Sequence, residues 1–258
     1  MLISTQGLII REKSMGEADR LLSVLTGERG VIRVFANGVK RTRSRNISST
    51  SLLCYSDFTL YSSRDTYKLN QAETIDSFYN LRNSIHSLAL AQYLCEIAGF
   101  FCVQDAPDKE SGEVLRMLLN ALYLICGGKK DPRLIKAAVE LRLLTLEGYM
   151  PDLTGCVGCR IPPLTRGAGV VGENLFFSLE NGHMRCEACA KDAARLIALP
   201  AGVLAAMRHI VSCEPGRLFS FELGNDAKDH LSRVCELYLL HTANCGFKTL
   251  EFLRTVAE

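Results

Sequence analysis

Two closely spaced cysteine pairs constrain this chain more than any other feature. Cys156 and Cys159 form one C-x-x-C pair, and Cys186 and Cys189 form a second, about 26 residues further on. Each two-residue spacer tightens into a turn that points both sulfurs the same way, so four thiolates come within reach of one tetrahedral ion. The spacing therefore predicts one zinc ion held by these four cysteines.

The segment between the pairs has little apolar core of its own. Adjacent prolines at 162 and 163 and three further glycines predict a loop, whereas residues 174–179 could form a short strand. A bound metal would have to hold such a segment together. We therefore expect the zinc to be structural.

Other uses of paired cysteines fit the sequence less well. Disulfides need an oxidising compartment, and a thioredoxin-like redox pair stands at the start of a helix within a βαβ pattern, which is absent here. A catalytic zinc needs an open coordination position, and four thiolates leave none. A zinc deaminase would also need an H-x-E motif, but His183 is followed by Met184 and Arg185.

Length and composition favour an ordinary globular protein. The chain has 258 residues, 48% of them apolar, which predicts two domains with a sizeable core. The N-terminus lacks the basic segment that precedes the apolar part of a signal peptide, and the most apolar run, residues 88–103, is interrupted by Gln92 and Glu96. Seven of the 11 cysteines are scattered singly, mostly in apolar helical patterns, and we expect a reducing cytoplasm.

Residues 1–76 predict a small β-barrel. Five short segments rich in apolar and β-branched residues are separated by turn signals: residues 2–10, 20–26, 30–36, 52–61 and 66–75. Five strands in a domain of this size are typical of a closed barrel, of which the OB-fold is the commonest.

A cationic segment joins the third and fourth predicted strands. Four of the six residues from 40 to 45 are basic, namely Lys40, Arg41, Arg43 and Arg45, and we group Arg33 of the preceding strand with them. Like charges gain nothing from burial together, so a phosphate backbone is their natural partner, and an OB barrel commonly carries single-stranded nucleic acid. A solvated loop is the alternative. The nearby aromatic residues Phe35, Tyr55, Tyr61 and Tyr67 could be stacking faces or core.

After residue 76 the apolar period changes from two to about 3.6 residues. The predicted helices cover residues 80–101, a stripe from 114 to 125, a segment from Asp131-Pro132 to Gly148 and, beyond the cysteines, residues 192–198, 202–212 and 228–242. The fold class is therefore α+β: an OB-fold barrel in residues 1–76, followed by an all-α domain in residues 77–258. A four-cysteine zinc-binding module is inserted in the second domain at about residues 150–192.

The order of these parts resembles the bacterial RecO recombination-mediator family. The likeness is carried by residues 16–30 (GEADRLLSVLTGERG), 36–44 (ANGVKRTRS), 146–153 (LEGYMPDL, leading into Cys156) and 248–253 (KTLEFL). It spans nearly the whole chain. One departure is Arg160, which follows the second cysteine where the family often has glycine. This departure affects the expected geometry of the turn more than metal binding, because all four thiols are present.

The resemblance implies a non-enzymatic DNA-repair protein. Such proteins bind single- and double-stranded DNA, anneal complementary strands and, with RecR, help load recombinase onto DNA coated by single-strand-binding protein. In agreement with this, the sequence has no Walker loop and no dinucleotide-binding fingerprint. Two rival classes are a zinc-ribbon regulator of duplex DNA, for which Arg160, Arg166 and Arg185 are too scattered, and an enzyme whose site is assembled only in space.

The resemblance also implies that the helical domain docks protein partners, among them the acidic, apolar-ended tail of single-strand-binding protein. A groove between apolar helices with a cationic rim would suit such a tail. The rim candidates are Arg116, Arg133, Lys136 and Arg142, although a solvated helix face would explain any one of them.

Overall fold

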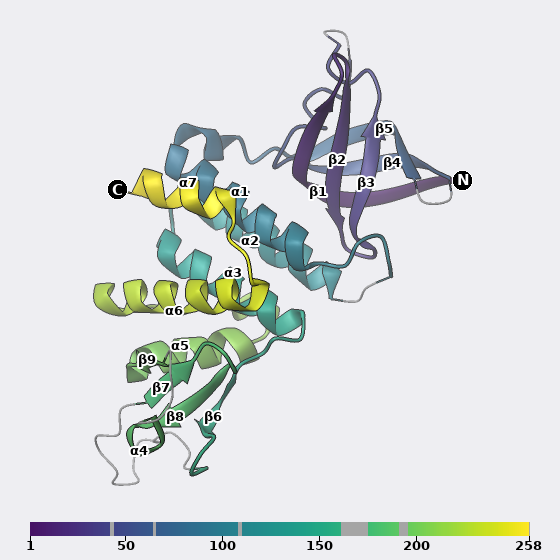
Figure 1. Cartoon of the computed structure of the whole chain (residues 1–258). Coiled ribbons are helices and arrows are strands. Elements are labelled where there is room, and N and C mark those ends of the chain that lie inside the picture. The colour runs from purple at the N-terminus through teal and green to yellow at the C-terminus, as the bar shows by residue number, and fades with distance from the viewer. Residues whose placement is uncertain (42–43, 64–65, 108–109, 161–174, 191–195, 258) are drawn as a thin grey trace. The chain divides into compact units, whose positions relative to one another are not determined.

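The computed structural model describes residues 1–41, 44–63, 66–107, 110–160, 175–190 and 196–257. The chain divides into two compact units (Figure 1). One contains residues 1–130 with 247–258, and the other contains residues 131–246. The expected division into a barrel domain of residues 1–76 and a helical domain of residues 77–258 stays a prediction.

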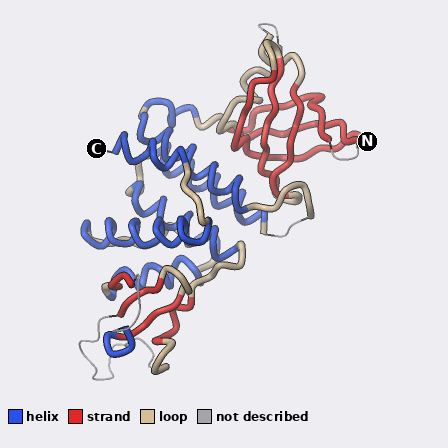
Figure 2. Tube along the Cα trace, viewed as in Figure 1, coloured by secondary structure: helices blue, strands red, loops and turns tan. Residues whose placement is uncertain are grey.

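Five strands close into a barrel at the start of the first unit (Figures 1 and 2). They are β1 (Leu2–Met15), β2 (Asp19–Thr26), β3 (Gly30–Ala36), β4 (Tyr55–Ser63) and β5 (Thr66–Asp76). Their order around the barrel is β1-β2-β3-β5-β4, and β4 pairs with β1 to complete the circle. The pairs are antiparallel except β3 with β5, which run parallel. The predicted five-stranded barrel is confirmed, because this order and closure are those of an OB-fold.

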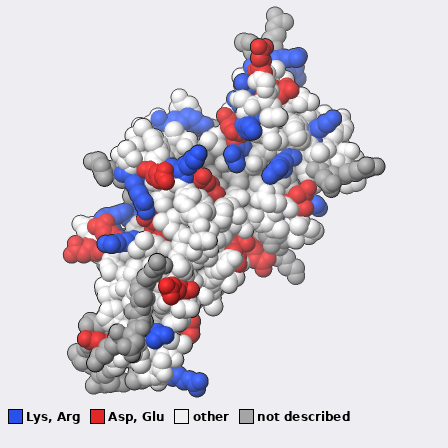
Figure 3. All heavy atoms as spheres, in the orientation of Figure 1, with Lys and Arg blue, Asp and Glu red and all other residues white. Residues whose placement is uncertain are grey.

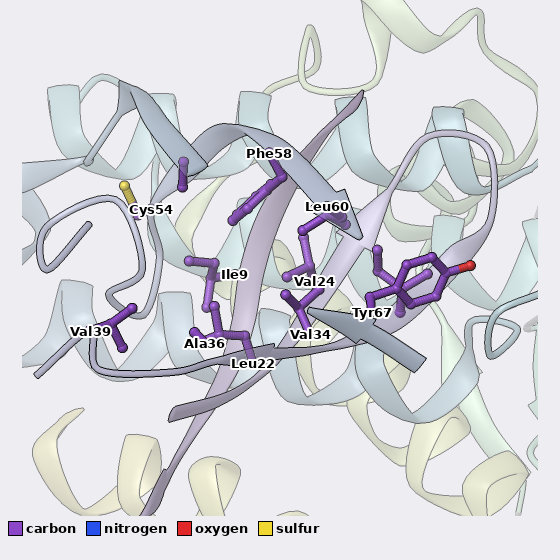
Figure 4. Close-up of a cluster of buried hydrophobic side chains, with 12 residues drawn as sticks. Ile9, Leu22, Val24, Val34, Ala36, Val39, Cys54, Phe58, Leu60 and Tyr67 are labelled. Atoms are coloured by element: carbon purple, nitrogen blue, oxygen red, sulfur yellow. The ribbon is translucent and has the colours of Figure 1, made fainter. Parts of the chain in front are cut away.

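Alternate residues of each strand fill the barrel. Ile32, Val34 and Ala36 of β3 are buried, and Phe58 and Leu60 of β4 face them across the interior. Figure 4 shows this cluster, in which Val39 and Cys54, from the connection after β3, lie on one side and Tyr67 lies on the other. The period of two in the sequence thus places one set of side chains inside and the alternate set on the outer surface.

Residues 103–105, which follow the first long helix, pair with the start of β3. The Val31 N–H donates to the Val103 carbonyl at 2.9 Å, and the Asp105 N–H donates to the Val31 carbonyl at 3.1 Å. Gly30 permits this approach, because its φ is +62° and a β carbon would lie 2.2 Å from the Val103 carbonyl oxygen.

Three long helices complete the first unit. They are α1 (Ile85–Phe101), α2 (Ser111–Gly127) and, from the far end of the chain, α7 (Lys248–Ala257). The helix expected over residues 80–101 is instead a 3-10 helix, Tyr79–Asn83, followed by α1. Ser84 separates the two because it is extended and its hydroxyl accepts from the Ser87 N–H, which caps α1.

The second unit is built on α3 (Pro132–Leu146), α5 (Ala201–Ser212) and α6 (Asn225–Ala243). The predicted start of α3 is confirmed: Asp131 accepts from the Arg133 N–H, and Pro132 occupies the first helical position. Helix α3 packs against α5 and α6, and the whole stretch from Leu134 to Leu144 is buried. The neighbours of α3 therefore enclose its charged residues Lys136, Glu140 and Arg142 together with its apolar ones.

A four-stranded sheet in the order β6-β8-β7-β9 carries the cysteine pairs. Its strands are β6 (Asp152–Cys156), β7 (Leu175–Ser178), β8 (His183–Cys186) and β9 (Leu196–Leu199), and a short helix α4 (Glu187–Ala190) follows β8. The strand expected near residues 174–179 is confirmed as β7. The loop expected between the cysteine pairs falls largely on residues 161–174, outside the described residues.

The helix expected over residues 192–198 is wrong where the structure describes it. Residues 196–199 form β9, which pairs with β7 so that Ile197 lies opposite Phe177. A four-residue apolar run is compatible with a strand or with a helix. Backbone pairing with β7 makes these residues a strand. Among the described residues, no helix has the length and apolar character needed to cross a membrane.

Candidate metal centre and nucleic-acid interface

The four paired cysteines meet at the end of the small sheet. Cys156 ends β6, Cys186 ends β8, Cys159 follows the first turn, and Cys189 lies in α4. All four sulfur atoms lie within 4.8 Å of one another, and the Sγ atoms of Cys159 and Cys186 are 3.7 Å apart. A tetrahedron of sulfurs around zinc has edges of about 3.8 Å, because each Zn–S bond is about 2.3 Å long. The four sulfurs are therefore placed to hold one metal ion.

Backbone hydrogen bonds shape the first cysteine turn. The Val157 N–H donates to the Met184 carbonyl at 3.0 Å, and the Arg160 N–H donates to the Cys156 carbonyl at 2.8 Å. Arg160 adopts a left-handed conformation with a φ of +59°. Glycine takes this conformation without strain, which explains physically why glycine suits this position better than arginine.

Gly158 leaves room for the sulfurs. A β carbon at this position would lie 2.9 Å from the Cys189 Sγ and 3.8 Å from the Cys156 Sγ. The space that a side chain at position 158 would occupy is thus taken up by sulfur atoms of both cysteine pairs.

The electrostatics of the cluster favour a bound cation. Burial raises the pKa of the Cys156 thiol, but hydrogen bonds from the backbone N–H groups of Cys159, Cys186 and Gly158 outweigh it and hold that pKa at about 6. Hydrogen bonding with the thiols of Cys186 and Cys156 raises the pKa of Cys189 to about 12. Four thiols so close together cannot all ionise unless a positive ion compensates their repulsion.

The cationic connection after β3 is fastened to the barrel. Val39 is 1% exposed and belongs to the barrel core. The Gly38 N–H donates to the Asp19 carboxylate at 2.6 Å, and the Lys40 N–H donates to the Ala18 carbonyl at 2.9 Å. Arg20 holds the far side of the connection by donating to the Thr50 carbonyl at 3.1 Å. The backbone of this segment is therefore fixed at several described points.

Most of the predicted phosphate-binding residues lie at the surface. Arg33, Arg41 and Arg45 are exposed, and Lys40 is partly exposed with its Nζ donating to the Ser14 Oγ at 3.3 Å. Arg43 lies outside the described residues. On the face drawn in Figure 3, Lys and Arg on the barrel are interspersed with Asp and Glu.

The four aromatic residues of the barrel take different positions. Tyr67 is core: it is 4% exposed and its hydroxyl donates to Asp105 at 2.8 Å. Tyr55 is partly buried and donates to the Gln6 side chain, also at 2.8 Å. Phe35 is half-buried, whereas Tyr61 is 53% exposed. Tyr61 thus presents the largest free surface of these rings.

The four cations expected at a groove rim do not share one environment. Arg116 is exposed on α2, and Arg133 is partly exposed but pairs with Asp131 and Asp229. For Lys136 and Arg142 the expectation of a solvent-facing rim is wrong, because both side chains are buried. Lys136 pairs with Glu140 and Glu236 at 2.8 Å, and Arg142 donates to the carbonyls of Ile210 and Val211 at the end of α5.

Sequence reasoning missed this buried ion cluster on α3 and α6. Glu140 is fully buried and stands four residues after Lys136, a spacing that places the two charges on one face of a helix. That spacing was the available signal. It does not indicate burial, which comes from Glu236 and the packing of α6.

Comparison with known proteins covers both units. Residues 1–78 match the family described as "Recombination protein O N terminal", and residues 82–251 match "Recombination protein O C terminal". The chain belongs to the RecO family of DNA repair proteins. Its relatives include "DNA repair protein RecO" of Acetivibrio thermocellus, which is 29% identical over 98% of this chain and 97% of the relative.

Two further RecO proteins show the same relationship. The one from Symbiobacterium thermophilum is 28% identical and covers 99% of this chain and 98% of the relative. The one from Dehalococcoides mccartyi is 33% identical over 72% of this chain and 69% of the relative. The family resemblance inferred from the sequence is therefore confirmed.

Proposed function

We propose that this RecO-family chain is a non-enzymatic recombination mediator. It binds single- and double-stranded DNA, anneals complementary strands and helps load recombinase onto DNA coated by single-strand-binding protein. The observation that carries this proposal is a closed five-stranded barrel with an anchored cationic connection at its surface. Barrels of this kind commonly bind single-stranded nucleic acid.

Annealing of this kind requires charge rather than catalytic groups. Two DNA strands repel each other through their phosphates, and a cationic protein surface screens that repulsion. Lys40, Arg41, Arg43 and Arg45, with Arg33 on β3, contact phosphate oxygens, which leaves the bases free to pair. The location that suits this activity is the bacterial cytoplasm, in association with the nucleoid.

The metal in the proposed mediator is one structural zinc ion. Cys156, Cys159, Cys186 and Cys189 would hold it, and the ion would supply the cross-link that joins the ends of β6 and β8 to α4. Four thiolates saturate the tetrahedron, so the ion takes no part in chemistry. Metal analysis of protein purified without added zinc tests this assignment, and less than about half an equivalent would contradict it.

The helices serve protein partners in this proposal. RecR and the C-terminal tail of single-strand-binding protein are the partners, and two of the candidate cations retain exposed surface: Arg116 in the first unit and Arg133 in the second. A tail peptide should bind the full chain more weakly as salt rises, because its acidic groups pair with cations. Because the two arginines belong to different units, each is replaced with alanine in a separate variant, and loss of peptide affinity in one variant identifies the unit that binds the tail. Unchanged affinity in both variants would exclude both residues as tail-binding cations.

Strand annealing is the decisive test of the whole function. Complementary oligonucleotides, bare or coated with single-strand-binding protein, should anneal faster with the full chain. A parallel screen for nuclease and ATPase activity separates a mediator from an enzyme. No acceleration with either substrate would contradict the proposal.

The cationic connection has a separate, quantitative test. Each phosphate contact on single strands contributes roughly 0.7 to the slope of log affinity against log salt. Replacing Lys40, Arg41, Arg43 and Arg45 together should make the plot less steep by up to about 3 units of slope, with little change in sequence preference. An unchanged slope would identify the segment as a solvated loop.

A further inference from the structure

A row of outward-facing side chains runs around the barrel from strand to strand. Residues directly opposite on neighbouring strands share one face of a sheet. The strand registers link Leu21 to Phe35, Phe35 to Lys68, Lys68 to Tyr61, and Tyr61 to Leu2. The row therefore passes over four strand boundaries, with the two aromatic residues on either side of one lysine.

These side chains face outward because their neighbours along the chain fill the core. Val34 and Ala36, on either side of Phe35, are buried, as are Leu60 before Tyr61 and Tyr67 before Lys68. Tyr61 is 53% exposed and Leu2 is 54% exposed, whereas Phe35 is half-buried. The first unit thus presents aromatic surface that its own core does not use.

The charges near the row favour a polyanion. Lys68 lies between the rings, Arg33 stands two residues from Phe35 on the same face of β3, and Lys13 lies opposite Leu21 at the end of the row. All three cations are exposed. Lys68 also interrupts the apolar surface, which suits a chain that alternates flat bases with phosphates better than it suits an apolar protein segment.

The cationic connection begins where β3 ends. Phe35 is the next-to-last residue of β3, and Lys40 follows it by five residues. The Lys40 Nζ donates to the Ser14 Oγ of β1, and Ser14 is the neighbour of Lys13 along that strand, on the alternate face. The charges of the connection therefore lie beyond the end of the strand that carries Phe35.

Acidic residues lie further off, in the direction along the strands that leads toward the cationic connection. The next outward set of paired residues, Ser4, Thr59 and Gln71, is uncharged, and the set beyond it contains Asp57 and Glu73. Asp57 is four residues from Tyr61, or about 13 Å along the strand. The row itself, from Tyr61 past Lys68 to Phe35, thus carries no acidic residue.

We propose that Tyr61 and Phe35 are base-stacking residues for single-stranded DNA, with Lys68, which lies between the rings, and Arg33, which lies beside Phe35 on β3, contacting the phosphates. This inference rests on the proposed DNA-binding function and adds the site at which unpaired bases bind. The two rings are two strands apart, about 10 Å, which is roughly three times the 3.4 Å rise between stacked bases of a duplex strand. Each ring therefore takes a separate base from a strand that has lost its duplex stacking.

A single-tryptophan sensor tests the site, because the chain contains no tryptophan. Tyr61→Trp places the fluorophore in the row, and Tyr79→Trp provides a matched control at a tyrosine that is 70% exposed on the 3-10 helix outside the row. On titration with oligo(dT), the emission of the Tyr61→Trp variant should be quenched along the same curve as DNA binding, while that of the Tyr79→Trp variant changes little. No quenching of the Tyr61→Trp variant at saturation, or equal quenching of both variants, would overturn the inference.

Affinity measurements with the full chain separate stacking from charge. Tyr61→Ala should weaken single-strand binding about 5- to 150-fold, the range for losing one stacked base, whereas Tyr61→Phe should keep it. Duplex affinity and the slope against salt should stay unchanged, because no phosphate contact is lost. Single-strand affinity of Tyr61→Ala within twofold of the parent chain would refute the stacking site while leaving DNA binding intact. Failure of the parent chain to bind any DNA would refute both proposals.

Discussion

Replacing Gly158 with alanine tests the metal centre most directly. Gly158 lies between the two cysteines of the first pair, and its φ falls outside the left-handed region that favours glycine. Alanine therefore adds no backbone strain, and the effect of the change comes from contact alone. The new methyl group would lie 2.9 Å from the Cys189 Sγ and 3.1 Å from the Cys189 Cβ.

The size of the effect follows from that contact. A carbon atom rests against a side chain at 3.4 Å or more, so the Cys189 sulfur has to give way by about 0.5 Å. Metal–ligand distances tolerate only about 0.2 Å of error. We expect the variant to bind Zn²⁺ about 10- to 100-fold more weakly, the usual loss when the support of a ligand is disturbed. This corresponds to about 1.4–2.7 kcal/mol.

Competition with a chromogenic chelator measures the affinity, and thermal unfolding with and without Zn²⁺ measures the linked stability. Gly216→Ala is the matched control, because a β carbon at Gly216 meets no atom within 4 Å. The control should keep the Zn²⁺ affinity of the parent chain. The reasoning is refuted if Gly158→Ala binds Zn²⁺ within twofold of the parent chain.

Three further substitutions test the second unit. Asp131 accepts hydrogen bonds from Arg133, which lower its pKa, so its stabilisation is fully present above the unfolded pKa of about 3.9 and fades as pH falls. Asp131→Asn should cost about 1–2 kcal/mol in urea unfolding at pH 7, a gap that narrows between pH 5 and pH 3; a constant gap would contradict this. Lys136→Met leaves the fully buried Glu140 without its closest cation and should cost about 3–5 kcal/mol, part of which the added change Glu140→Gln should recover. Arg160→Gly removes a left-handed arginine and should stabilise the zinc-loaded chain by up to about 1 kcal/mol in thermal unfolding, whereas a loss of stability would show that the arginine is needed.

Features that depend on neighbours in the chain were predictable from the sequence. The four cysteines were found from their spacing, since a C-x-x-C pair places its two sulfurs together whatever surrounds it. Asp131-Pro132 identified the start of α3, because capping involves only adjacent residues. The period of two located the five strands, although their ends moved by several residues, as with β1, which extends to Met15.

Features that depend on distant residues were decided by the tertiary structure. Lys136 and Arg142 looked like surface cations, but α5 and α6 enclose them and supply carbonyl and carboxylate partners. Residues 196–198 looked helical, but β7 offered unpaired backbone groups that turned them into a strand. The cationic connection looked like a free loop, whereas Val39 anchors it in the barrel.

The surface row of Phe35, Lys68 and Tyr61 shows the same division most clearly. The sequence determined that each of the three residues belongs to a strand, because the alternation of side chains is local. The alternation itself did not place β5 between β3 and β4; that order was expected only through the assumed OB-fold, since strand order depends on long-range hydrogen bonding and on closure of the barrel. Only that order brings residues 35, 68 and 61 together on one face, because the register between strands, and not distance along the chain, sets which side chains are neighbours.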